Sequence, residues 1–97
     1  MTKDQIALEE NMPGVRVKYL PSVDFLHFVR AKSIDTLSIL ETPESTFLVK
    51  VSQENHDVIL ADGPGSSAPM LFSDLKTTAL FVIEIFAIRC IAFELRD

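Results

Sequence analysis

Apolar and polar residues alternate with a period of two over several separate stretches of the chain. This period is typical of β-strands that bury one face. It predicts strands over 36–41, 46–52, 57–62 and 89–96, and an earlier one over 15–19. The side chains predicted to point inward from 46–52 are Phe47, Val49 and Val51. In the other strands, Leu37 and Ile39 share one face, Val58 and Leu60 lie on the face opposite Ile59 and Ala61, and Ile91, Phe93 and Leu95 share one side of the last strand.

Two stretches instead repeat their apolar residues at helical spacing. The first predicts a helix over 22–32 with Ser22 as its N-cap after Pro21, and Phe25, Leu26 and Val29 form its apolar stripe. The second predicts a helix that follows Ser73 as its N-cap, with Asp74 in its first turn. One stripe of this helix holds Leu75, Ala79, Val82, Ile83 and Phe86, and a second stripe holds Phe81, Ile85 and Ile88.

The order of these elements predicts an α+β fold. Short polar turns at 42–45 and 53–56 join consecutive strands, which favours antiparallel pairing. We therefore expect one domain over 22–97, in the order α-β-β-β-α-β, with an antiparallel sheet of about four strands and two main helices packed on one face. Residues 1–21 are expected to form an N-terminal extension, either a short helix near 3–10 and a strand, or a partly disordered tail.

The second helix is apolar nearly all round between Ala79 and Ile88, and Glu84 alone interrupts it. A helix on the face of a small sheet should keep one polar side. Three explanations are open: the helix is covered on both sides, it forms an interface, or part of it is a strand, because several residues are β-branched. The interface hypothesis predicts contact with a protein partner or in a homodimer through Phe81, Ile85 and Ile88.

Composition limits the functional classes. The chain has 97 residues, a formal charge of −5 and a single cysteine, Cys90. A domain of this size has a marginal core that self-association would help, and one thiol excludes a disulfide-stapled fold. The apolar stretch 79–95 contains Glu84, Arg89 and Glu94, and it is shorter than a membrane span requires. With no signal peptide at the N-terminus, these features predict a cytoplasmic protein without membrane contact.

Charge is distributed unevenly along the chain. The basic segment 15–32 could contact nucleic acid, but four cations without an aromatic platform, in a chain of acidic net charge, favour a solvated face. Its cations are Arg16, Lys18, Arg30 and Lys32. The acidic segment 33–62 could instead occupy a basic site on a host or defence protein, as an inhibitor, through Glu41, Glu44, Glu54 and Asp57.

Candidate chemistry is sparse. The run Gly63-Pro64-Gly65-Ser66-Ser67-Ala68 matches a dinucleotide-binding pattern, but Pro69 follows and no helix opens there, so a turn is predicted. Cys90 could be a nucleophile activated by His27 or His56, and its apolar neighbours predict instead a small buried hydrophobic residue.

The acidic and metal-binding candidates lead to the same expectation. His27, His56, Asp57 and Asp62 fit no metal-ligand spacing. Glu84 could be a buried acid or base, a partner of Arg89 or Lys76, or the exposed edge of its helix. We therefore expect no catalytic residue, no cofactor and no metal.

The order of elements from Ser22 onward resembles small plasmid-borne partition-associated proteins of the ParC type. The resemblance rests on the helix Ser22–Lys32, the strands that follow it and the run Pro69-Met70-Leu71-Phe72-Ser73-Asp74-Leu75 before the second helix. In that family the second helix ends at a glycine, where this chain has Ala87-Ile88. The resemblance implies a non-enzymatic accessory protein of a bacterial mobile element, with a role in plasmid maintenance or its control, and it assigns no catalytic residue.

Overall fold

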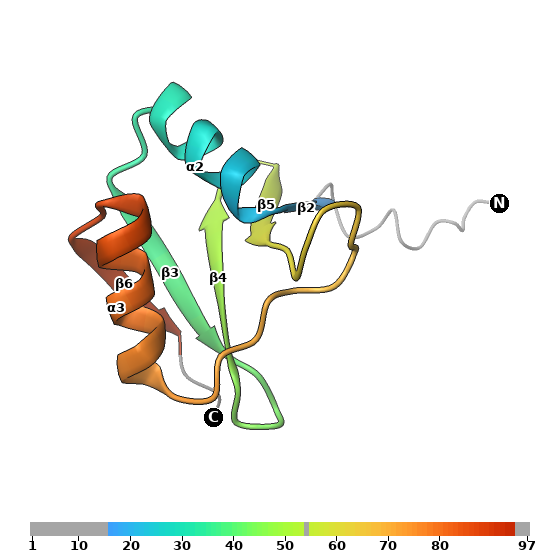
Figure 1. Cartoon of the computed structure of the whole chain (residues 1–97), viewed down its shortest axis with the longest axis vertical. Helices are drawn as coiled ribbons and strands as arrows, with labels where there is room; N and C mark the ends of the chain where they lie inside the picture. Colours follow the sequence, from blue (N-terminus) through green and yellow to red (C-terminus); the bar gives the residue numbers. More distant parts are fainter. Residues whose placement is uncertain (1–15, 54, 95–97) are drawn as a thin grey trace, which may run out of the picture.

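The computed structural model describes residues 16–53 and 55–94, so the helix expected near 3–10 lies outside the described residues. The described chain runs as a strand, a helix, three strands, a helix and a strand, an order close to the predicted one (Figure 1). The elements are β2 (Arg16–Leu20), α2 (Ser22–Ala31), β3 (Thr36–Glu41), β4 (Phe47–Ser52), β5 (His56–Leu60), α3 (Leu75–Phe86) and β6 (Cys90–Glu94).

The strands form one five-stranded sheet in the order β2-β5-β4-β3-β6. The central strand β4 runs antiparallel to both neighbours, pairing Lys50 with Ser38 of β3 and with Ile59 of β5. The two edge strands are parallel to theirs: β2 pairs with β5, and β6 pairs with β3. Four of the five strands therefore point the same way.

The α+β class is confirmed, but the prediction of about four antiparallel strands differs from the observed sheet, which has five strands and is mixed. The stretch 15–19, assigned to an N-terminal extension, contributes the edge strand β2. Each helix returns the chain along the sheet, so β2 and β3, and likewise β5 and β6, run in the same direction. Because β4 is antiparallel to both β3 and β5, the edge strands β2 and β6 pair in parallel with β5 and β3. The short polar turns therefore predicted correctly only the two antiparallel pairs, β3 with β4 and β4 with β5.

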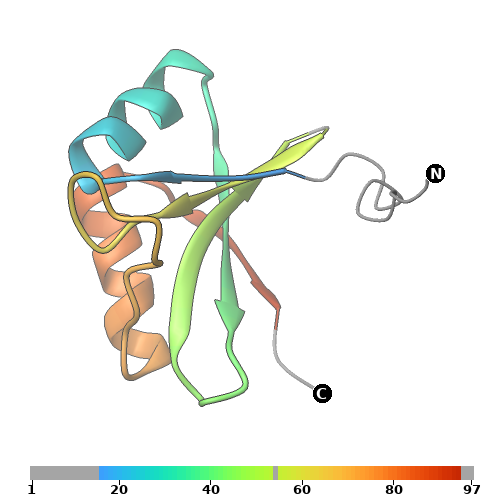
Figure 2. The ribbon, with the colours of Figure 1, turned by 90° about the vertical axis from the view of Figure 1, so that its right-hand side faces the viewer.

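Both helices cover the same face of the sheet (Figure 2). The connection through α2 leads from β2 past two strands to β3, and the connection through α3 leads from β5 past two strands to β6. Both connections move across the sheet in the same direction. Because crossovers between parallel strands are right-handed, both helices must then lie on the same side.

The core fills the space between this sheet face and the helices. The side chains predicted to point inward from β4 are confirmed there, and Phe25 and Val29 of α2 and Val82 and Phe86 of α3 meet them. The rings of Phe25 and Phe86 lie 5.0 Å apart and join the two helices. The strand residues in this cluster are Leu37, Ile39, Val49, Val51, Val58 and Leu60.

Both helices begin one position away from the predicted cap. The N-cap of α2 is Pro21 rather than Ser22, with no side-chain hydrogen bond, and that of α3 is Asp74 rather than Ser73. Asp74 Oδ1 accepts a hydrogen bond of 2.7 Å from the Thr77 backbone N–H, and its Oδ2 accepts one of 3.0 Å from the Thr77 hydroxyl. These bonds hold the pKa of the Asp74 carboxyl below its ordinary value.

Ala87 ends α3 in the left-handed conformation, with φ at 58°. Its backbone N–H donates to the Ile83 carbonyl over 3.1 Å, which closes the last turn of the helix. The turn directs Ile88 into the core and starts β6 two residues later. A glycine is usual at such a position because a Cβ is strained there.

We expect Ala87→Gly to stabilise the protein by about 0.5–1 kcal/mol. Relief of the strained conformation outweighs the extra freedom that glycine has in the unfolded chain. Ala79→Gly, in the body of the same helix, is the control and should lose about 1 kcal/mol. Urea unfolding measures both variants, and an Ala87→Gly protein no more stable than the wild type would contradict the expectation.

We also expect Asp74→Asn to be less stable than the wild type at neutral pH, although asparagine can still accept a hydrogen bond. The folded pKa of Asp74 is lowered, so its charge stabilises the fold above the unfolded value of 3.8 and this contribution disappears as the pH falls through the folded value. Urea midpoints measured across this range should converge. A gap between the two proteins that persists in acid would show that the charge is not the cause.

Candidate interaction surface

The three residues predicted to form an interface occupy different environments in and after α3. Ile85 is exposed, whereas Ile88 is only 4% exposed and belongs to the core. Phe81 is half-buried, and its ring lies 5.1 Å from that of Phe72 and 5.6 Å from that of Phe86. Of the three, Ile85 is therefore the one that the fold presents to solvent.

The exposed surface of α3 is nevertheless rich in apolar side chains. Leu80 is 46% exposed, Ile83 41% and Ile85 46%. Sequence periodicity placed Ile83 on the core stripe and did not single out Leu80. The core instead takes Thr78, Val82 and Phe86, spaced by four residues. Thr78 fits there because its hydroxyl donates to the Asp74 carbonyl over 2.7 Å.

The two flanks of α3 face different strands of the sheet. Phe81 marks one flank of the helix, because its ring lies beside that of Phe72, which bridges to Phe47 of β4. Ile83 lies on the flank opposite Phe81, on the side of β3 and β6. On β6, Phe93 shares the helix-covered face with Ile39 and is 49% exposed.

Four exposed residues lie along this side of the helix, and we call them the α3 stripe: Lys76, Leu80, Ile83 and Glu84. Lys76, Leu80 and Glu84 are spaced by four residues, and Ile83 lies beside Leu80 on the helix surface. Glu84 has no ion pair with any residue of the described chain. Of its three predicted environments, the exposed edge of the helix is the one observed.

The four cations of the basic segment are all exposed. Arg16 and Lys18 lie on the edge strand β2, while Arg30 and Lys32 lie at the end of α2. Of the acidic candidates, Asp57 is paired with Lys50, Glu44 is exposed in the turn between β3 and β4, Glu41 ends β3, and Glu54 lies outside the described residues.

Cys90 is exposed, so the prediction of a buried thiol is wrong. It begins an edge strand and pairs with Thr36 on the face that the helices leave uncovered. His27 lies on α2, across the sheet, and His56 lies on β5, three strand spacings or about 14 Å away. The fold therefore brings neither histidine to the thiol.

The glycine-rich run forms a turn that closes on itself. The Asp62 N–H donates to the Ala68 carbonyl over 2.9 Å, and the Ala68 N–H donates to Ser66 Oγ over 3.0 Å. The next helix begins at Leu75, after the bridge that Phe72 makes to β4. The turn is therefore separate from any helix N-terminus. Within the described ranges, no group of histidine, cysteine and acidic side chains is arranged to hold a metal ion.

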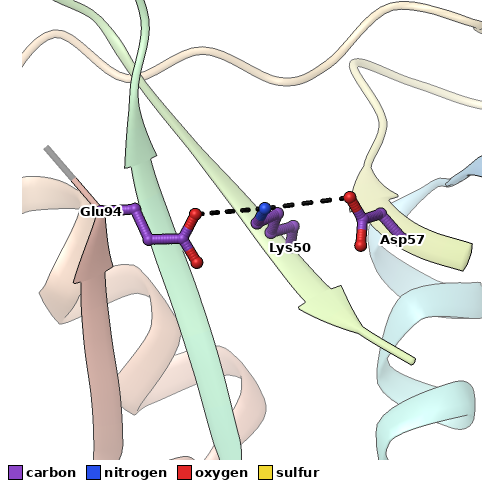
Figure 3. A network of polar contacts seen from close by, with 3 residues as sticks. All are labelled: Lys50, Asp57 and Glu94. Carbon is purple, nitrogen blue, oxygen red and sulfur yellow. Dashed lines mark ion pairs between the residues drawn. The ribbon is translucent and has the colours of Figure 1, made fainter. Parts of the chain in front are cut away.

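The uncovered face of the sheet carries a charged cluster (Figure 3). Lys50 points away from the helices, and its Nζ lies 3.2 Å from Glu94 Oε1 and 3.8 Å from Asp57 Oδ2. The Lys50 side chain is only 14% exposed. The cluster thus links the central strand to β5 on one side and to the edge strand β6 on the other.

Comparison with known proteins gave no relative: no family model, curated protein or solved structure matched the chain. Neither helix of the described residues combines the length and the apolar character that crossing a membrane would require.

We expect Lys50→Met to destabilise the protein by about 1–2 kcal/mol, because it leaves two partly buried carboxylates without their cation. The same substitution in an Asp57→Asn/Glu94→Gln background should cost much less, since no carboxylate then loses a partner. Urea unfolding of the four proteins completes the cycle. An equal loss in both backgrounds would assign the effect to packing of the lysine stem instead of its charge.

Proposed function

We propose that this chain is a non-enzymatic accessory protein that acts by binding another protein chain through the exposed surface of α3. The observation that supports the proposal is the pair of apolar side chains on one side of that helix, Leu80 and Ile83, each more than two-fifths exposed. Apolar side chains gathered on one exposed element are typical of interaction sites. Phe93, on the helix-covered face of the edge strand β6, is a further exposed apolar side chain.

The edge strand β6 adds a second argument for this side of the molecule. An exposed strand edge attracts other chains unless charges or bulges protect it. The edge strand β2 carries Arg16 and Lys18, whereas the charge on β6 is Glu94, which pairs with Lys50 of its own chain. The side with α3 and β6 is therefore the less protected of the two edges.

The biological setting in the proposal is the maintenance of a bacterial plasmid or the control of that maintenance. It is supported by the resemblance to ParC-type partition-associated proteins that the element order from Ser22 onward carries. In such a role the protein would act by assembly and not by turnover of a substrate.

Photo-crosslinking in bacterial cells tests the proposal. A photoreactive phenylalanine analogue at Leu80, Ile83 or Phe93 should join the chain to a protein, either a second copy or another polypeptide, identified by mass spectrometry. The same analogue at Val23, which is exposed on α2, is the matched control and should give little product. Equal yields at all four positions, or no protein product at the first three, would overturn the proposal.

A further inference from the structure

We propose that a second copy of this chain binds to the α3 stripe, with the two helices antiparallel about a twofold axis at Leu80. This inference rests on the proposed function, because it names the partner of the same surface. The residues that carry it are exposed and lie along one side of a single helix: Lys76, Leu80, Ile83 and Glu84.

The spacing of the stripe makes it complementary to itself. Leu80 lies midway between Lys76 and Glu84, four residues from each. A twofold axis through Leu80, perpendicular to the helix, places each Leu80 beside its copy. The same operation brings Lys76 of one chain level with Glu84 of the other, twice. Isologous dimers require this type of self-matching surface.

Charge selects the antiparallel arrangement. In a parallel pair, each Lys76 would face its own copy and each Glu84 would do the same, so both contacts would be repulsive. In the antiparallel pair both contacts are attractive. The apolar centre and the charged ends therefore favour one orientation, which an arbitrary apolar patch would not do.

The size of the contact indicates a modest affinity. A helix of 12 residues is about 18 Å long, so two such helices alone form less than a standard protein interface. We expect a monomer at low concentration and a dimer in the micromolar range. The measured mass should rise from 10.8 kDa toward twice that value as the concentration increases.

The first experiment is sedimentation equilibrium of the full chain over this concentration range. Leu80→Asp should weaken self-association at least about tenfold, since it places two carboxylates at the axis. Leu80 is exposed, so the variant should fold, and circular dichroism with urea unfolding checks this point. Val23→Asp, on the exposed surface of α2, is the matched control and should dimerise like the wild type.

A charge exchange tests the orientation. Lys76→Glu and Glu84→Lys should each weaken the dimer about tenfold, because each replaces two attractive contacts by repulsive ones. The double variant restores both contacts with reversed sign, and its affinity should return to the wild-type value. Failure of the double variant to recover would overturn the antiparallel arrangement.

Cysteine crosslinking tests the position of the axis. In a Cys90→Ser background, which removes the exposed native thiol, Leu80→Cys should form a disulfide-linked dimer under mild oxidation. Val23→Cys in the same background should form no disulfide-linked dimer.

The outcomes separate this inference from the proposed function. A wild-type chain that stays monomeric throughout, or a dimer that neither Leu80→Asp nor the charge reversals affect, overturns the inference. If in that case Leu80 and Ile83 still crosslink to a different protein in cells, the proposed function stands with another partner. If they crosslink to nothing, both fail.

Discussion

The contact between Phe25 and Phe86 is the constraint on which the rest of the structure depends. It joins α2 to α3 over one face of the sheet, and both rings are essentially buried. Each helix also connects two strands that are not neighbours, so its position determines where the following strand can enter the sheet. Since Ala87 turns the chain directly after Phe86, this contact also sets where the chain leaves α3 for β6. The exposed side of α3 is determined in the same way.

The two sides of α3 lie in different environments, the core and the solvent, and this explains the composition of the helix. Val82 and Phe86 pack into the core, and Thr78 joins them with its hydroxyl satisfied by the backbone. On the other side, Leu80 and Ile83 remain more than two-fifths exposed. Full burial of such a side chain is worth about 1.5–3 kcal/mol. Because Leu80 and Ile83 are only partly buried, folding gains only part of this free energy. The rest can be gained when a partner chain covers them.

Much of the local structure could be predicted from the sequence. Periodicity identified both helices, the strands and the inward residues of β4, because each pattern reports on one buried face. Pairing was harder, since parallel neighbours such as β2 and β5 are separated by residues 21–55 and no short turn links them. The environment of Cys90 was also missed. Its apolar neighbours are those of a buried strand, and only the sheet order shows that β6 is an edge.

The interaction surface was the part that periodicity could least resolve, because a helix that is apolar on both sides has no polar stripe to orient it. Charge supplies the missing information. On the uncovered sheet face, Lys50 finds both of its carboxylate partners within its own chain. Lys76 and Glu84 cannot do so with each other, because eight residues of helix separate them by about 12 Å along the axis. In the proposed antiparallel dimer, the two side chains lie at the same level on facing helices. The separation that prevents pairing within one helix is thus the one that makes the stripe complementary to its own copy.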